Sequence, residues 1–329
     1  MDIANDANAG QGAPLAAKLA AVGVLLALIG LEVVLLRRRG QRYPWRDALI
    51  SMGVSLGLPV ARLLDAAVIG GLYVLAYQHR VFNLPADSAV TWAAAFVWLE
   101  FALYWLHRWS HEVRWLWASH VVHHTPTEVI LPTAFRLPWT GLLQGNWLPG
   151  LIGMAIGFPP TVILGVLGLE LGYVFLQHTR FIGKLGPLEW LLNSPTHHRL
   201  HHSSEPQHHD CNYGSVLIVF DRLFGSFKRD EREPERYGVY GADAAGSRGV
   251  FDAALGEWRR LFLDIWNAPD GLTALRVAIS RPGSTVAAQR REAPPSAAEL
   301  FDVQPLAERL VDAGRAANEM PRGAAHRVA

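Results

Sequence analysis

Long apolar stretches, separated by short polar segments, run through the first half of the chain. Residues 13–36 and 88–106 are almost continuously apolar, and residues 48–77 are apolar with Pro59 in the middle. A helix needs about 20 apolar residues to cross a bilayer. Each stretch therefore predicts a membrane-spanning helix, and we expect Pro59 to interrupt the second one.

A helical hairpin is predicted further along the chain. Residues 140–157 and 161–177 are apolar, and they are joined by Phe158, Pro159 and Pro160. Proline cannot continue a helix, so this junction is a turn. Each arm is slightly short for a full crossing, and the hairpin brings the expected number of membrane-embedded helices to four or five.

The charged residues suggest how these spans are oriented. Residues 37–46 contain five arginines, and short loops rich in arginine lie on the cytoplasmic side. The chain terminus before the first span is then external, and the ends of the third span and of the hairpin return to the cytoplasm. Arg62 and Asp65 lie one turn apart within the second span, and we expect them to pair because an unpaired charge there is costly.

Composition narrows the class of protein further. The chain has 329 residues, of which 50% are hydrophobic and 18% are charged, against about 25% charged in soluble domains. A net charge of +1 gives no strong attraction to nucleic acid. Cys211 is the only cysteine, which excludes an intrachain disulfide and a cysteine-based metal site.

Eight histidines form three clusters at spacings that share one face of a helix. The clusters are His107 and His111; His120, His123 and His124; and His198, His201 and His202. Neutral imidazoles bind Zn, Cu, Fe and Ni, and eight of them exceed the roughly four to six ligands of one ion. The pattern predicts a site with more than one metal. His178 stands alone at the end of an apolar helix, where a capping or snorkelling role is the simplest interpretation.

The two stretches that carry these clusters resemble the fatty-acid hydroxylase and sterol desaturase family of membrane non-haem di-iron oxygenases. Residues 106–124 contain HxxxH and HxxHH boxes, and residues 193–227 contain the last box and a DCNYG and DRLFG tail. The strings HRWSHE, NSPTHHRLHH and GPLEW are most similar to the alkylglycerol monooxygenase-like branch. The resemblance covers roughly residues 92–227.

The resemblance implies a ligand set and a chemistry. The family takes one or two ligands from between its second and third boxes, so His178 becomes a candidate, and His197 is expected to replace or join His198 or to support a ligand from behind. The implied metal ligands are His107, His111, His120, His123, His124, His178, His197, His198, His201 and His202. The implied cofactors are two iron ions and O2. The sequence shows no haem-binding module, so we expect an external electron donor, either a separate protein or a small molecule.

Three other residues have a functional and a structural interpretation. Glu112 follows the first box, where it could bind iron, fix a histidine tautomer, or remain a surface helix acid. Asp210 could orient a ligand imidazole or form a turn. Tyr213 could line the pocket or pack beside it.

Further polar residues are expected to act at the edges of the site. Arg136 could bind a phosphate headgroup or a water network, or lie at the membrane interface. Asp221 and Arg222 are expected to form a structural ion pair. The remaining histidines are expected to face solvent, namely His79, His208, His209 and His326.

We expect an all-α integral membrane protein with a helical, histidine-rich cytoplasmic cap. Residues 1–91 are expected to form the first transmembrane helices and loops, residues 92–230 the catalytic domain, and residues 231–329 the C-terminal part. In the last part, residues 250–279 are amphipathic and should pack on the cap or lie on the membrane surface. Residues 296–320 predict one more helix within a flexible tail.

The function expected from these features is a di-iron oxygenase that hydroxylates an unactivated C–H bond of a lipid, whether a fatty acyl chain, an ether lipid or a sterol. A desaturase or C-methyl oxidase on the same scaffold is the alternative. A divalent-metal transporter or sensor is the alternative of another class, but a transporter would place its ligands within the spans. We expect a multi-pass protein of a bacterial inner membrane, with lipid and an electron donor as partners and no nucleic acid.

Overall fold

The computed structural model describes residues 15–229, 232–240 and 247–284. The predicted helix at 296–320, the C-terminal tail and His326 lie outside these residues. Within them the protein is helical, with two isolated β-bridges and no strand. The α-helices are α2 (Leu15–Arg38), α3 (Trp45–Gln78), α4 (Ala89–Glu112), α5 (Arg114–His124), α6 (Gly141–Gln144), α7 (Leu148–Ile156), α8 (Pro160–Gln177), α9 (Pro195–His201), α10 (Val219–Phe224), α11 (Val250–Trp266) and α12 (Gly271–Ile279). The 3₁₀ helices are η1 (Leu131–Phe135), η2 (Gly186–Trp190) and η3 (Pro206–His208).

Four helices in the described residues are long and apolar enough to cross a membrane: α2, α3, α4 and α8. Large apolar side chains project outward from them, and Leu56 on α3 is 79% exposed. Lipid tails would cover such side chains at no hydrophobic cost. The prediction of an all-α membrane protein with four to five embedded helices is confirmed at its lower bound.

Pro59 does not interrupt the second span as predicted. Helix α3 continues through it for 34 residues, because one missing N–H leaves the rest of the helical hydrogen bonds intact. The predicted ion pair within this helix is present, with Arg62 Nη1 2.8 Å from Asp65 Oδ2.

The predicted hairpin forms, but its arms are unequal. Helix α7 has only nine residues, whereas α8, which was expected to be slightly short for a crossing, is long enough to span. Between them Gly157 has a φ of +133°, and its missing Cβ would lie 2.2 Å from the carbonyl oxygen of Phe82. Only glycine fits this turn.

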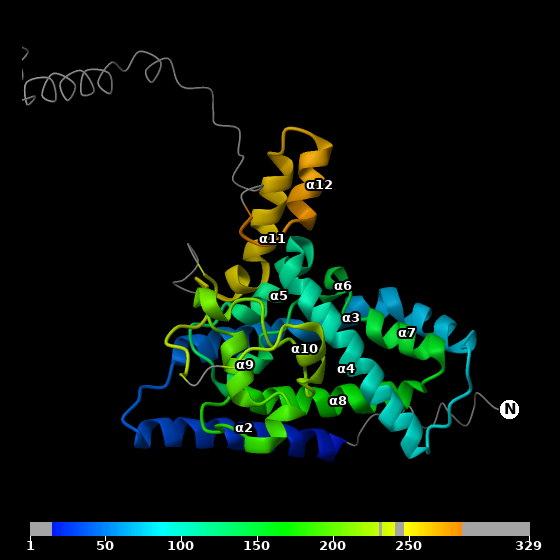
Figure 1. The fold of residues 1–329 in the computed structure, drawn as a ribbon, viewed down its shortest axis with the longest axis horizontal. Coiled ribbons are helices and arrows are strands. Elements are labelled where there is room, and N and C mark those ends of the chain that lie inside the picture. The colour runs from blue at the N-terminus through cyan, green and yellow to red at the C-terminus, as the bar shows by residue number, and fades with distance from the viewer. Residues whose placement is uncertain (1–14, 230–231, 241–246, 285–329) are drawn as a thin grey trace, which may run out of the picture.

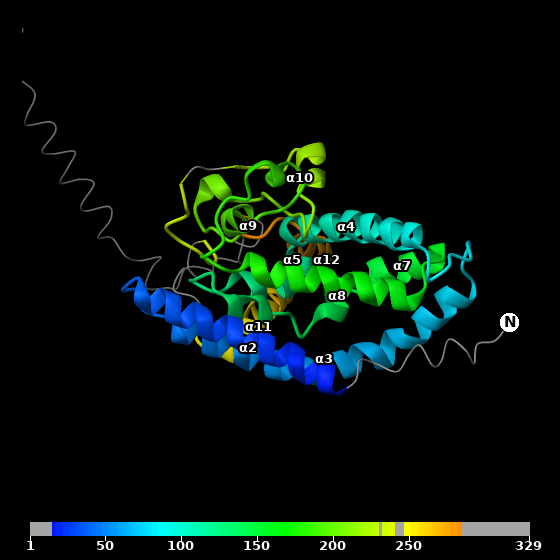
Figure 2. The same cartoon turned by 90° about the horizontal axis from the view of Figure 1, so that it is seen from below.

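The helices enclose the histidines from several directions. Figure 2 shows α2 and α3 on one side, α7 and α8 in the middle, and α4, α9 and α10 on the opposite side. Buried apolar residues such as Leu99, Ile163 and Val166 pack α4 against α7 and α8. Helix α5 crosses the end of α4, and α11 packs on α5 (Figure 1).

The amphipathic segment 250–279 forms two helices instead of one. Pro269 cannot extend α11, and Asp270 caps α12 by accepting a 2.8 Å hydrogen bond from the Thr273 N–H. The buried Trp258 and Leu261 hold α11 against α5. Packing on the histidine-bearing helices, one of the two expectations for this segment, is therefore observed.

Candidate metal centre

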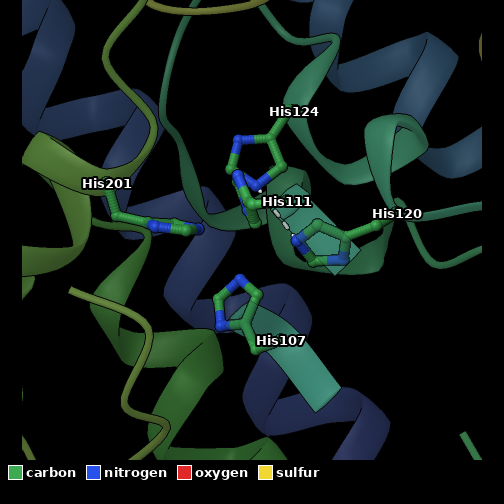
Figure 3. Close-up of side chains that lie close together, drawn as sticks. All are labelled: His107, His111, His120, His124 and His201. Carbon is green, nitrogen blue, oxygen red and sulfur yellow. Dashed lines mark hydrogen bonds between the residues drawn. The ribbon is translucent and has the colours of Figure 1, made fainter. Parts of the chain in front are cut away.

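Five histidines from three helices form a first histidine group. They are His107 and His111 of α4, His120 and His124 of α5, and His201 of α9. One nitrogen of each ring lies within 4.8 Å of the others. Figure 3 shows the five rings converging on one space, where the Nε2 atoms of His120 and His124 are 3.1 Å apart.

Four more form a second histidine group beside the first. They are His123 of α5, His178 directly after α8, and His198 and His202 of α9 and its C-terminus. His178 Nε2 is 3.3 Å from His123 Nε2 and 3.0 Å from His198 Nε2. The two groups touch, because the rings of His124 and His202 stack with centroids 4.5 Å apart.

Helix periodicity explains how two helices serve both groups. In α5, His120 and His124 are four residues apart and share a face, whereas His123 is rotated by about 100° from its neighbour. In α9, His198 and His202 share a face in the same way, and His201 points to the first group. Val113 has an extended backbone between α4 and α5, and this break lets the first two boxes meet.

Backbone carbonyls orient three of the rings. The Nδ1 atoms of His107, His201 and His178 lie 2.7, 2.8 and 2.8 Å from the carbonyl oxygens of Tyr213, Cys211 and Val174. A carbonyl only accepts, so each Nδ1 carries the proton and each Nε2 presents a lone pair. The sequence suggested carboxylates for this role.

A local turn brings two of these carbonyls to the histidines. Asp210 and Asn212, on either side of Cys211, have φ values of 56° and 55°. Aspartate and asparagine tolerate this left-handed conformation better than other side chains. The Asp-x-Asn spacing in HHDCNYG was therefore a sequence signal for the turn, although not for what it orients.

The nine side chains fit metal ions. The Nε2 atoms of His107, His111 and His201 are buried and have no hydrogen-bond partner, which is costly without a ligand. Two nitrogens bound to one ion at about 2.0–2.1 Å lie about 3 Å apart, like the Nε2 pairs of the second group. Because the nitrogens fall into two adjacent groups, they suit two metal ions better than one.

Burial keeps the rings uncharged. It lowers the pKa of His178 to about 4. Burial, with smaller effects of neighbouring histidines, also holds the pKa values of His120, His123, His124 and His202 well below the usual value. The neutral imidazole is the form that binds metal.

The structure places His197 outside both groups. Its backbone N–H and its Nδ1 take part in a capping box with Ser194 at the start of α9, and its Nε2 lies 4.0 Å from a carboxylate oxygen of Glu189. Its side chain is buried, and burial lowers its pKa to about 4. It supports the helix that carries His198, His201 and His202.

Glu112 and Asp210 lie outside the two histidine groups, and Asp210 takes part in a turn, which was its structural interpretation. Glu112 pairs with Arg108 at 3.1 Å and with Arg281 at 3.5 Å. Asp210 lies 3.5 Å from Arg281 and 3.4 Å from the Tyr213 hydroxyl. Both acids thus form an ionic rim next to the first group. Tyr213 lines that group, with its ring centroid 5.2 Å from His111.

Three other expectations were wrong. Arg136 is fully buried and donates to Asp47 Oδ1 at 2.9 Å, so it does not face a lipid headgroup. Asp221 accepts from the Tyr213 and Gly214 N–H groups instead of pairing with Arg222. His208 is buried, with its Nδ1 3.0 Å from Ser203 Oγ.

Two buried acids escaped the sequence interpretation. Glu100 of α4 accepts hydrogen bonds from the Val216 and Leu217 N–H groups at 3.0 and 2.7 Å. Glu170 of α8 interacts with Glu100, and neither of its oxygens has a donor among the described residues. Acids within apolar stretches are rare enough to be a signal. Glu100 holds the loop whose Tyr213 carbonyl orients His107.

Comparisons with known proteins agree with the predicted resemblance. Residues 92–226 match the family model described as fatty acid hydroxylase. The alkylglycerol monooxygenase of Xenopus tropicalis is 34% identical over 250 residues, which are 74% of this chain and 54% of that protein. The human alkylglycerol monooxygenase is 40% identical over 197 residues, 59% of this chain and 43% of that protein.

A bacterial relative also matches. The ornithine lipid hydroxylase OlsE of Rhizobium tropici is 29% identical over 197 residues, 60% of this chain and 57% of that protein. The chain thus spans about half the length of the curated relatives it matches. No solved structure matches it. The resemblance predicted from the histidine boxes is confirmed.

Proposed function

We propose, from the match of residues 92–226 to fatty acid hydroxylases, that this protein is a membrane-bound di-iron oxygenase that hydroxylates an unactivated C–H bond of a lipid. One observation carries the proposal: nine histidines, six of them buried and three partly buried, form two touching groups. Relatives named for hydroxylating lipids support the substrate class. An alkyl chain of an ether lipid or an acyl chain is the favoured target.

The protein residues would hold and shield the metal ions. The first group would bind one ion and the second group the other. Iron supplies the redox chemistry with O2 that attack on a C–H bond needs, whereas zinc does not change its oxidation state. The Tyr213 and Cys211 carbonyls fix the orientation of His107 and His201, which is the usual role of groups behind a metal ligand.

Aromatic side chains cover one side of the first group. The rings of Trp117 and Tyr213 lie 5.1 and 5.2 Å from that of His111. Burial raises the pKa of the Tyr213 hydroxyl, so this group keeps its proton and remains a hydrogen-bond donor. These rings would exclude water from the reacting carbon.

The location of the ligands suits a substrate held in a bilayer. His107 and His111 lie in the last turns of α4, and His178 directly follows α8. Both helices are long enough to span, so a lipid chain lying along them would reach the histidine groups. By the positive-inside rule, the arginines at 37–46 would place these groups on the cytoplasmic side of a multi-pass protein, where an external electron donor would reduce the site.

The first test is metal content and O2 consumption of the purified protein. We expect about two iron ions per chain and reductant-dependent O2 uptake, both reduced strongly in His201→Ala. The exposed His79, far from both groups, provides the control: His79→Ala should match the wild type. Zinc or copper with no O2 uptake after anaerobic iron loading would overturn the proposal in favour of a metal-handling protein.

Lipid products separate the two reactions possible on this scaffold. With ¹⁸O2 and membrane lipid, a hydroxylase adds one labelled oxygen to the product. A desaturase would instead give an unlabelled product that lacks two hydrogens, and a C-methyl oxidase would place the labelled oxygen on a methyl group of a sterol. Mass spectrometry of the extracted lipids distinguishes these outcomes.

A further inference from the structure

Helix α11 exposes an apolar stripe beside the face that it buries. Trp258 and Leu261 are buried against α5, whereas Phe251, Phe262 and Trp266 are 73%, 52% and 87% exposed. These three positions fall within one narrow sector of the helix, since they are separated by 11 and 4 residues. Such a stripe is costly in water.

Helix α12 exposes apolar side chains as well. Leu272, Leu275 and Ile279 are each more than half exposed, and their spacing of three and four residues puts them on one face. Glu257 and Arg260 of α11, by contrast, pair at 2.7 Å on a sector turned by about 120° or more from Phe262 and Trp266. The α11–α12 hairpin thus has an apolar side and a polar side, the pattern of a helix that lies at a membrane surface.

The stripe continues the lipid-facing surface of the spanning helices. The ring of Phe251 packs edge-on against Trp139 at 5.7 Å. The Trp139 indole N–H donates to the carbonyl oxygen of Val54 in α3 at 2.7 Å. Leu56 and Val60 of the same helix are 79% and 64% exposed. The hairpin therefore begins where the lipid-facing side of α3 lies.

The direction of the hairpin fits a surface position. Figures 1 and 2 show α11 and α12 running across the direction of α2 and α8 and extending away from the bundle. If α2 and α8 cross the bilayer, α11 and α12 run along its surface. They do so at the level of α5, which carries three of the histidines and packs against α11.

We infer that the α11–α12 hairpin lies in the surface of the lipid bilayer, with its apolar stripe among the acyl chains and Arg260 in water. The occupant of the stripe is lipid, not a second protein. Binding of the hairpin to the bilayer would affect the metal centre, because the residues that follow α12 contact its surroundings. The Ser280 carbonyl accepts a 2.9 Å hydrogen bond from the Arg114 N–H, and Arg281 lies near both Glu112 and Asp210.

Site-specific labelling tests the inference. Trp266→Cys carries a polarity-sensitive NBD fluorophore in phosphatidylcholine nanodiscs, and Arg260→Cys is the matched control on the polar side of the same helix. The buried Cys211 should not react with the fluorophore. Wild-type protein treated with the same reagent verifies this. We expect blue-shifted emission at 266 and strong quenching when doxyl-labelled phosphatidylcholine is included, with neither effect at 260.

Two results would overturn the inference. Water-like emission at both positions would place the hairpin in solution. Blue-shifted emission at 266 that doxyl lipid does not quench would mean that protein, such as a second copy of the chain, covers the stripe. Leu275→Cys on α12 repeats the measurement independently if the Trp266 variant folds poorly.

Discussion

At the scale of single residues, the buried Arg136 binds protein groups rather than a ligand. It donates to Asp47 Oδ1, Ser51 Oγ and Thr125 Oγ1. Asp47 in turn accepts from the Thr127 N–H and hydroxyl. The pair ties the start of α3 to the segment that follows the second histidine box.

Asp47→Ala should therefore destabilise the protein strongly. The substitution leaves a buried guanidinium without its counter-ion, which typically costs about 3–5 kcal/mol. Thermal unfolding in detergent measures the effect, with the exposed Asp87→Ala as the control. The double variant Asp47→Ala/Arg136→Met should recover part of the loss, because it removes both charges; no recovery would argue against the ion pair as the cause.

At the scale of elements, buried polar side chains of α4 and α8 hold the segments on either side of the third histidine box. Glu100 accepts from Val216 and Leu217, and Gln177 donates to the carbonyl oxygens of Asn193 and Ser215 at 2.8 Å. Buried polar groups are stable only when they are satisfied in this way. The loop after the third box therefore depends on two spanning helices for its position.

Glu100→Leu should weaken metal retention as well as stability. It leaves two backbone N–H groups without an acceptor, at about 1–3 kcal/mol for each buried group, and it frees the loop that orients His107. Glu170→Gln is the matched comparison, because it changes the neighbouring buried acid and leaves the Glu100 carboxylate to accept from the loop. Iron per chain and unfolding temperature are measured together; Glu100→Leu protein that keeps both at wild-type values would contradict the expectation.

At the scale of the whole molecule, the enclosed histidines make stability depend on pH. Burial holds the pKa values of His198, His201 and His202 well below 6.5, the usual value to which they return in the unfolded chain. Between pH 6.5 and the lowered pKa values, these histidines bind protons in the unfolded state but not in the folded state. Stability is therefore complete above about pH 6.5 and falls as the pH falls.

The metal-free protein should accordingly unfold at a lower temperature at pH 5.5 than at pH 7.5. Thermal unfolding of chelator-treated protein in detergent measures the shift. His201→Ala, which has one fewer such ring, should show a smaller shift over the same range. An unfolding temperature that is equal at the two pH values would mean that the histidines are more accessible to water than the structure indicates.

The local pattern of the sequence predicted the helices and the ligand candidates. Apolar length predicted α2, α3 and α4 as spans, because crossing a bilayer imposes a minimum run of apolar residues, whereas the arm that forms α8 was expected to be slightly short. Histidines at helical spacing predicted shared faces, because side-chain direction follows from the helical period. The prediction that Pro59 interrupts the second span was wrong, because the remaining hydrogen bonds of α3 and its surroundings stabilise the helix despite one lost hydrogen bond.

Only the tertiary structure decided how the histidines are divided and oriented. The five-and-four arrangement arises from the crossing of α5 and α9 over the ends of α4 and α8, and contacts between residues far apart in sequence leave no local period. The same contacts brought the Tyr213 carbonyl to His107 and placed His197 in a cap. They also turned Glu112 and Asp210 toward Arg281, because partners of a charged side chain are chosen by packing rather than by neighbouring sequence.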